Sequence, residues 1–178
     1  MPTTSAVPGL AQPDPRWPAR AARDMERVRR ALGTSCHAVH HVGSTSVAGL
    51  PAVPVLDLVA ELDAMSLQGT ARLRLLAHGF ADVPGPSHCA AFVVVDALSG
   101  CRTVELVLYP FGHEAVRSAV AFFACLRIRP DVAAAYGAMK VQARAQHGAG
   151  TSSYGAAKQA WVQRHAQTSH DLPLHPVE

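Results

Sequence analysis

The stretch HVGSTSVAGLP, residues 41–51, runs on into the apolar segment VLDLV, residues 55–59, and the two carry most of the chemistry-bearing side chains of this chain. Gly43 lets the backbone approach a bound group closely, and three hydroxyl side chains follow it at positions 44–46. A turn lined with hydroxyls and backbone N–H groups is typical of an anion-binding loop. The stretch therefore predicts an anion site, and the alternative is an ordinary strand-to-helix turn with a capping Ser.

Two carboxylates interrupt apolar segments that have the composition of strands. Asp57 lies within VLDLV, and Glu105 lies within VELVL, residues 104–108. A buried carboxylate is costly unless it is paired or binds a metal ion. If the two strands are neighbours, Asp57 and Glu105 would share a divalent cation or a proton. The alternative is that Glu105 points to solvent from an open face of the sheet.

Length and composition indicate one folded domain. The chain has 178 residues, of which 49% are hydrophobic and 16% charged, and this excludes disorder for most of its length. The net charge of +3 suits an anionic small molecule or nucleotide, but it is not the dense basic surface of a nucleic-acid binder. The low charge also leads us to expect self-association, for example as a homodimer.

The cysteines and the apolar runs indicate a cytoplasmic protein. The four cysteines show no Cys-x-x-Cys spacing, which is typical of reduced thiols. The first residues lack the features of a secretory signal, and no apolar run is long enough to span a membrane. We therefore expect a cytoplasmic location and no membrane partner.

Hydrophobic periodicity predicts an α/β (α+β) fold, a small mixed β-sheet flanked by helices. We expect a flexible N-terminal arm over residues 1–15, one domain over residues 16–168 and a C-terminal tail over residues 169–178. The helices are expected at 18–32, 66–78, 114–127, 131–147 and 153–167, and the strands at 36–41, 53–62, 80–83, 90–95 and 102–108.

The same residues resemble the GrpB-like family, whose signature reads roughly His-Val-Gly-Ser-Thr-Ser-Val-Pro-Gly-Leu followed by Pro and Asp. The match covers residues 41–57, with Pro54 in register, and its Gly-Ser-Thr-x-Val-x-Gly-Leu run is specific. Weaker matches extend the resemblance from about residue 15 to 165. They are Trp17, Leu126-Arg127 with Pro130, Tyr136 with Lys140, and Tyr154 with Lys158.

The resemblance implies a nucleotidyltransferase-like fold, in which a Gly-Ser turn holds nucleotide phosphates and carboxylates hold Mg²⁺ or Mn²⁺. This chain departs from that pattern. Val59 stands where nucleotidyltransferases usually carry a second Asp, and VELV at 104–107 stands where the family tends to carry histidines. Val53 replaces a Lys, and Phe122 to Cys125 replaces a run with Arg-Asp. Either the reaction has changed in this chain or it has been lost.

Basic and aromatic side chains complete the expected site. Tyr136 and Lys140 are four residues apart, as are Tyr154 and Lys158, so each pair shares one helix face. The lysines can reach phosphate or carboxylate oxygens. The alternative for each is a solvated Lys beside a half-buried Tyr, and Arg127 carries the same ambiguity.

We expect Asp57, Glu105 and His41 to be catalytic, His41 by orienting the turn or donating a proton, with Asp57 and Glu105 as metal ligands. The expected substrate-binding residues are Gly43, Ser44, Thr45, Ser46, Arg127, Lys140, Tyr154 and Lys158. The main hypothesis is metal-assisted nucleotidyl or group transfer to or from an anionic small molecule. The alternatives are a repurposed biosynthetic enzyme, for cyclisation or isomerisation with Asp57 as base, and a non-catalytic nucleotide- or metabolite-binding module.

Overall fold

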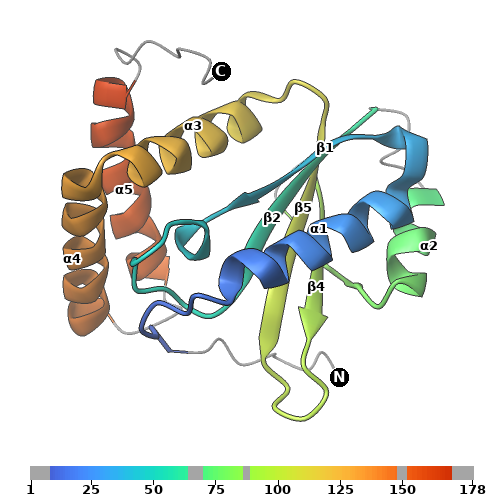
Figure 1. Cartoon of the computed structure of the whole chain (residues 1–178), viewed down its shortest axis with the longest axis horizontal. Coiled ribbons are helices and arrows are strands. Elements are labelled where there is room, and N and C mark those ends of the chain that lie inside the picture. Colours follow the sequence, from blue (N-terminus) through green and yellow to red (C-terminus); the bar gives the residue numbers. More distant parts are fainter. Residues whose placement is uncertain (1–8, 64–69, 86–88, 148–151, 170–178) are drawn as a thin grey trace.

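The computed structural model describes residues 9–63, 70–85, 89–147 and 152–169 (Figure 1). These residues form one five-stranded sheet with the strand order β1-β2-β5-β4-β3. The strands are β1 (Cys36–Val42), β2 (Leu56–Leu62), β3 (Ala81–Val83), β4 (Ala90–Val95) and β5 (Arg102–Pro110). Only β2 and β5 pair in parallel within this described sheet, and the other neighbours are antiparallel. The expected mixed sheet is therefore confirmed.

Five α-helices of the described chain surround this sheet. They are α1 (Trp17–Leu32), α2 (Thr70–Ala77), α3 (Glu114–Ile128), α4 (Pro130–His147) and α5 (Ser152–Ser169). Two short 3₁₀ turns, η1 (Gly33–Ser35) and η2 (Ser44–Ser46), precede and follow β1. In Figure 1, α1 crosses in front of the sheet, whereas α3, α4 and α5 gather at the left of the view.

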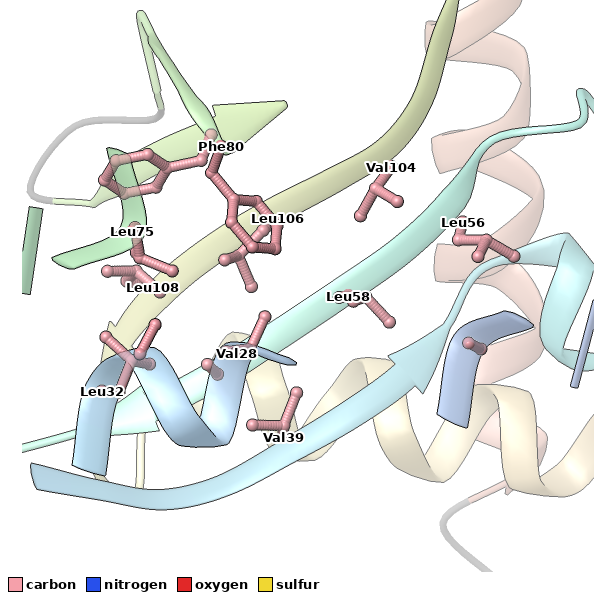
Figure 2. Packing of buried hydrophobic residues seen from close by; sticks show 14 of the residues in the cluster. Val28, Leu32, Val39, Leu56, Leu58, Leu75, Phe80, Val104, Leu106 and Leu108 are labelled. Atoms are coloured by element: carbon pink, nitrogen blue, oxygen red, sulfur yellow. The ribbon is translucent and has the colours of Figure 1, made fainter. Parts of the chain in front are cut away.

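The main core lies between α1, α2 and one face of the sheet (Figure 2). Val28 and Leu32 of α1 face Leu58 of β2 and Leu106 of β5, and all four side chains are almost fully buried. Because side chains alternate along a strand, burying Leu56 and Leu58 against α1 turns Asp57 to the opposite face. The core therefore decides which face of the sheet carries the carboxylate.

The opposite face is covered by α3, which contacts it through Val116, packed with Val42 and Val59. Helices α3, α4 and α5 join through Phe122, Tyr136 and Trp161, and the Tyr136 and Trp161 ring centroids lie 5.0 Å apart. Val47 and Leu50, from the segment after η2, pack into the same cluster. This cluster therefore fixes the segment that follows the Gly-Ser turn against the three C-terminal helices.

The register of β2 and β5 places Asp57 directly opposite Glu105. Since these strands are hydrogen-bonded neighbours, the two side chains leave the sheet on the same face. An irregularity in the pairing of β4 with β5, between Val94 and Val95, lies next to Arg102 at the start of β5. The backbone register therefore brings the two carboxylates together, as the sequence led us to expect.

The element boundaries follow the expected ones with local differences. The strand expected from Val53 begins at Leu56, because Pro54 has no N–H and the Val55 N–H bonds to the Val53 carbonyl at 2.7 Å. Residues 64–69, at the start of the second expected helix, lie outside the described residues. No helix within the described part of the chain is both long enough and apolar enough to cross a membrane.

The segment expected as a flexible arm is described from residue 9 onward. Ala11 forms an isolated antiparallel bridge with Ala52, through N–H to O distances of 2.8 and 3.1 Å. Residues 1–8 and 170–178, which include most of the expected tail, lie outside the described residues. The described part of the arm therefore has a fixed partner next to the Gly-Ser turn.

Truncating Leu58, which is 1% exposed between β2 and α1, should lower the free energy of unfolding by about 2–5 kcal/mol through lost burial and a residual cavity. Urea unfolding of Leu58→Ala measures this loss. Leu98→Ala is the matched control, because Leu98 is 98% exposed in the β4–β5 connection. Equal unfolding midpoints for the two variants would show that this face of β2 is not the core.

Candidate functional site

The Gly-Ser turn begins where β1 ends, and it is closed against the Asp57 side chain. Gly43 has a φ of +74°, in the left-handed region that favours glycine. A Cβ placed on Gly43 would overlap Oδ2 of Asp57, so no larger residue fits. Within the turn, the Ser46 hydroxyl donates to the Gly43 carbonyl at 2.7 Å. Glycine at this position therefore lets the backbone approach the carboxylate.

His41 holds the turn from the other face of the sheet. Its Nε2 lies 2.9 Å from the Thr45 hydroxyl, which in turn donates to the Val55 carbonyl at 3.4 Å. Burial, together with the nearby Arg127, lowers the pKa of His41 to about 4, so the ring is neutral at pH 7. Since Val42, not His41, pairs with Asp57, the two side chains lie on opposite faces. The contacts of His41 thus fit the expected orienting role and keep it away from Asp57.

Arg127 also acts on the backbone of the turn. Its Nε donates to the Ser46 carbonyl and its Nη2 to the His41 carbonyl, both at 3.0 Å. Arg127 is not one of the residues that line the two cavities beside Asp57. It is therefore placed to fix the end of β1 and the turn, and its expected contact with a ligand stays a prediction.

Two cavities open beside the turn and meet at three residues. The larger, of about 350 Å³, has an apolar and aromatic wall that includes Phe123, Tyr136 and Val162. The smaller, of about 180 Å³, is lined by Leu10, Ser44, Thr45, Val53, Val55, Asp57, Glu105, Lys140, Tyr154 and Lys158. Both cavities share Ser44, Asp57 and Lys158. Most of the expected site residues thus surround one space.

The two carboxylates in this space differ in their partners. Burial raises the pKa of Asp57 to about 6, with a further contribution from the neighbouring Glu105, whereas Lys158 and Lys140 oppose the shift. Glu105 is more exposed, and its Oε1 accepts a hydrogen bond from Nη1 of Arg102 at 3.0 Å. Among the described residues, Asp57 has no cation within ion-pair distance. It therefore stands without a direct counter-charge at the point where the cavities meet.

Lys140 and Lys158 bring positive charge from α4 and α5. Lys140 is 1% exposed, donates a short hydrogen bond to the Pro51 carbonyl and lies 5.0 Å from the centre of the Tyr136 ring. Burial, and then the charge of Lys158, lowers the pKa of Lys140 to about 7. Lys158 lies over the Tyr154 ring at 5.5 Å. The two Tyr-Lys pairs therefore face the site rather than open solvent.

Tyr136 links the lysines to the turn. Its ring is almost fully buried, and burial raises the pKa of its hydroxyl, which is hydrogen-bonded to the Ser44 side chain. Both members of this Tyr-x-x-x-Lys pair thus lie at the site. Tyr136 is hydrogen-bonded to Ser44, and Lys140 lines the smaller cavity. Arg102 and Leu10 are further members of the site that the sequence did not single out, because both lie near it through strand and bridge pairing alone.

Asp57 and Glu105 are the residues that could hold a divalent cation. Two carboxylates that line one cavity and leave adjacent strands in register match the way Mg²⁺ is often held, by one or two carboxylates and substrate oxygens. Within the described ranges, no group of three or more His, Cys, Asp or Glu side chains is placed to hold a metal ion. The two carboxylates thus fit a cation only when oxygens of a bound ligand complete the coordination shell of the cation. Glu105 must then also give up its ion pair with Arg102.

Gly43→Ala should lower the free energy of unfolding by more than the cost of a left-handed backbone, because the new methyl group meets the Asp57 carboxylate. Gly49→Ala is the matched control, since Gly49 has a φ of +76° and nothing within 4 Å of an added Cβ. We expect Gly49→Ala to cost about 1 kcal/mol and Gly43→Ala to cost about 1–3 kcal/mol more, measured by urea unfolding. Equal losses would contradict the close packing of Gly43 on Asp57.

Comparison with solved structures supports the fold on which this site is built. GrpB from Enterococcus faecalis is similar with a TM-score of 0.78 and 21% identity, covering 92% of this chain and all of that chain. A Cid1 poly(U) polymerase structure with MgGTP bound has a TM-score of 0.52 and 14% identity, covering 82% of this chain and 50% of that chain. At these identities the likeness shows the fold alone, which is the expected nucleotidyltransferase-like fold.

Comparison of sequences identifies the family. The UPF0157 protein YqkA from Bacillus subtilis is 26% identical over 147 residues, which is 83% of this chain and 43% of that protein. This chain thus spans less than half of that relative's length. The family model described as GrpB protein matches residues 8–168, which include the turn, both carboxylates and both lysines. The chain belongs to the GrpB protein family.

Proposed function

We propose that this chain binds an anionic small molecule where the two cavities meet, and that it is an enzyme of group transfer. The observation that carries the proposal is the convergence of Ser44, Asp57 and Lys158, which line both cavities at once. The Ser44 hydroxyl and the Lys158 ammonium offer donors for a phosphate or carboxylate group. A polar space of this kind beside a larger apolar one is typical of sites that orient a small molecule.

The uneven character of the two cavities supports a ligand with two unlike parts. Phe123, Tyr136 and Val162 give the larger cavity an apolar wall for a ring or hydrocarbon part of the ligand. The smaller cavity holds both lysines beside the carboxylates and suits the anionic part. A nucleotide has both parts, and so do many phosphorylated or carboxylated metabolites. Because the Cid1 poly(U) polymerase of similar fold was solved with MgGTP bound, a purine nucleotide is the first ligand to test.

Metal assistance is part of the same proposal. Asp57 and Glu105 would hold Mg²⁺ or Mn²⁺ together with oxygens of the bound anion. When bound, the cation would neutralise charge on the anion and orient it for attack. Lys158 would bind the anion, Ser44 would position it through its hydroxyl, and Glu105 would have to exchange Arg102 for the cation. Without a cation at this position, the Asp57 pKa of about 6 would instead suit a general base near neutral pH.

A second candidate function is metal-free binding of the anion without turnover. The observation that favours it is the ion pair between Arg102 and Glu105, at 3.0 Å, which leaves Asp57 facing two lysines. Three basic side chains surround the two carboxylates, which favours an anion over a divalent cation. Such a module would respond to the ligand equally well after chelation of all metal.

Thermal-shift and calorimetric titration with GTP, ATP, pyrophosphate and carboxylated metabolites, with and without Mg²⁺ or Mn²⁺, test the two candidates. We expect at least one anion to stabilise the protein. Lys158→Met should lower the affinity for that anion at least tenfold. Arg164→Met is the matched control and should leave the affinity unchanged, because Arg164 is exposed on the same helix. A response to no anion in any metal condition would contradict the proposed function.

Arg102→Ala separates the metal-assisted candidate from the metal-free one. Removing Arg102 frees Glu105, so the metal-assisted candidate predicts tighter Mg²⁺ binding in the presence of the anion. The metal-free candidate predicts anion binding that is independent of Mg²⁺ in both proteins. Calorimetric titration of Mg²⁺ into the anion-bound wild type and variant measures the difference.

Asp57→Asn should stabilise the protein above about pH 6. The pKa of Asp57 is raised on folding, so the folded state holds a proton that the unfolded state releases, and stability falls as pH rises from about 4 to about 6. The uncharged Asn avoids this loss, which we expect to be on the order of 1–2 kcal/mol after allowing for partial solvent screening. Urea unfolding at pH 4 and pH 7.5 measures it, and a gain at pH 4 as large as that at pH 7.5 would contradict the assignment.

A further inference from the structure

The two lysines of the chain line the same cavity. Of the sixteen Lys and Arg residues in the chain, fourteen are Arg, and the two lysines are Lys140 and Lys158. They come from different helices, α4 and α5, yet both line the same cavity of about 180 Å³. All the other basic side chains of this group, in ion pairs and on the surface alike, are arginines.

A guanidinium and an ammonium differ in one property that matters here. Arg stays protonated in proteins and cannot act as a nucleophile, whereas Lys can release its proton and attack an electrophilic carbon. For holding an anion alone, Arg would serve at least as well, because its planar fork matches carboxylate and phosphate groups. Two lysines at one cavity in an Arg-using chain therefore point to amine chemistry.

Lys140 has the surroundings of a neutral amine. It is 1% exposed, and its polar contact is with the Pro51 carbonyl. Among the described residues no carboxylate lies within ion-pair distance of either lysine. The other charged groups that line this cavity are Lys158, which lowers the pKa of Lys140, Asp57, which raises it, and Glu105. With burial as the largest cause, the pKa of Lys140 is lowered to about 7.

We propose that Lys140 forms an imine with a small anionic carbonyl compound whose carboxylate or phosphate group is bound by Lys158. The proposal rests on the anion site of the proposed function and names its ligand class. The smaller cavity has the volume of about six water molecules, which suits a short keto or aldehyde acid. The larger cavity beyond Ser44 and Asp57 leaves room for the rest of a longer molecule.

The reaction balances with the residues present. The lone pair on Nζ of Lys140 forms the N–C bond as the C–O π bond opens, and the carbonyl oxygen takes the electron pair. Two protons then pass from nitrogen to oxygen, and the oxygen leaves as water when the C=N bond forms. Asp57 lines the same cavity, and its carboxylate can carry the protons from nitrogen to oxygen. No oxidant, reductant or metal is needed.

Reductive trapping tests the proposal directly. The full-length protein is incubated at pH 7 with glyoxylate and sodium cyanoborohydride, which reduces an imine to a carboxymethyl-amine, and the products are located by intact mass and peptide mapping. Because the chain has two lysines besides its N-terminal amine, each product is assigned without ambiguity. We expect Lys140 to react at least tenfold faster than Lys158 and than either lysine of the urea-unfolded protein.

Matched variants separate the roles of the two lysines. Lys140→Arg keeps a long basic side chain but removes the amine, and it should abolish the fast product. Lys158→Met should slow the reaction with glyoxylate at least tenfold more than the reaction with neutral acetaldehyde, because acetaldehyde has no anionic group for Lys158 to bind. Thermal unfolding of each variant checks that it is folded. Label confined to the N-terminal amine and Lys158, with Lys140 unmodified in the folded wild type, would overturn the proposal.

An anion without a carbonyl electrophile distinguishes failure of this inference from failure of the proposed function. Oxalate should stabilise the protein and compete with glyoxylate for the fast labelling of Lys140. If oxalate or phosphate stabilises the protein while Lys140 stays unlabelled, the anion site stands and the imine proposal is wrong. If no anion stabilises the protein and Lys140 stays unlabelled, both are wrong.

Discussion

The site depends on the contact between the Gly43 backbone and the Asp57 carboxylate. This contact leaves no space for a Cβ, and it joins the end of β1 to the start of β2 at the point where the polar turn begins. Around it, the hydrogen bond between His41 and Thr45 fixes the turn from one face of the sheet. Arg127, which belongs to α3, donates hydrogen bonds to two backbone carbonyls at the two ends of the turn. The hydrophobic core turns Asp57 outward, and the aromatic cluster of α3, α4 and α5 delivers the lysines opposite it.

Electrostatics adds a second consequence of this contact. Asp57 sits in a polar but poorly solvated space, where a like charge at Glu105 and two lysines act on it in opposite directions. The same poorly solvated space disfavours the charged form of Lys140 and lowers its pKa. Carboxyl and amine groups whose pKa values approach each other near neutrality can exchange protons with a ligand, whereas ordinary surface pairs stay fully ionised.

Local sequence predicted the turn, Asp57 and both Tyr-Lys pairs, because each depends on spacing within one element. The adjacency of Asp57 and Glu105 was predictable only as a hypothesis, since it rests on the parallel pairing of strands far apart in the chain. The position of His41 relative to Asp57 required the antiparallel register of β1 and β2. Arg102 was not predictable, because it reaches Glu105 beside an irregularity in β4–β5 pairing, and the burial of Lys140 depends on packing of α4 against residues 50 and 51.

The parallel pairing of β2 with β5 also bears on how the chain folds. β1 with β2 and β4 with β5 are antiparallel pairs of strands that follow each other in the chain, whereas β2 and β5 are separated by two further strands and a helix. Long-range parallel pairing is slow to form, because loop closure precedes any stabilising contact. The like charges of Asp57 and Glu105 therefore face each other only when the two halves of the sheet join. A ligand that offsets this repulsion acts on the assembled sheet, and so it lengthens the lifetime of the native state more than it speeds its formation.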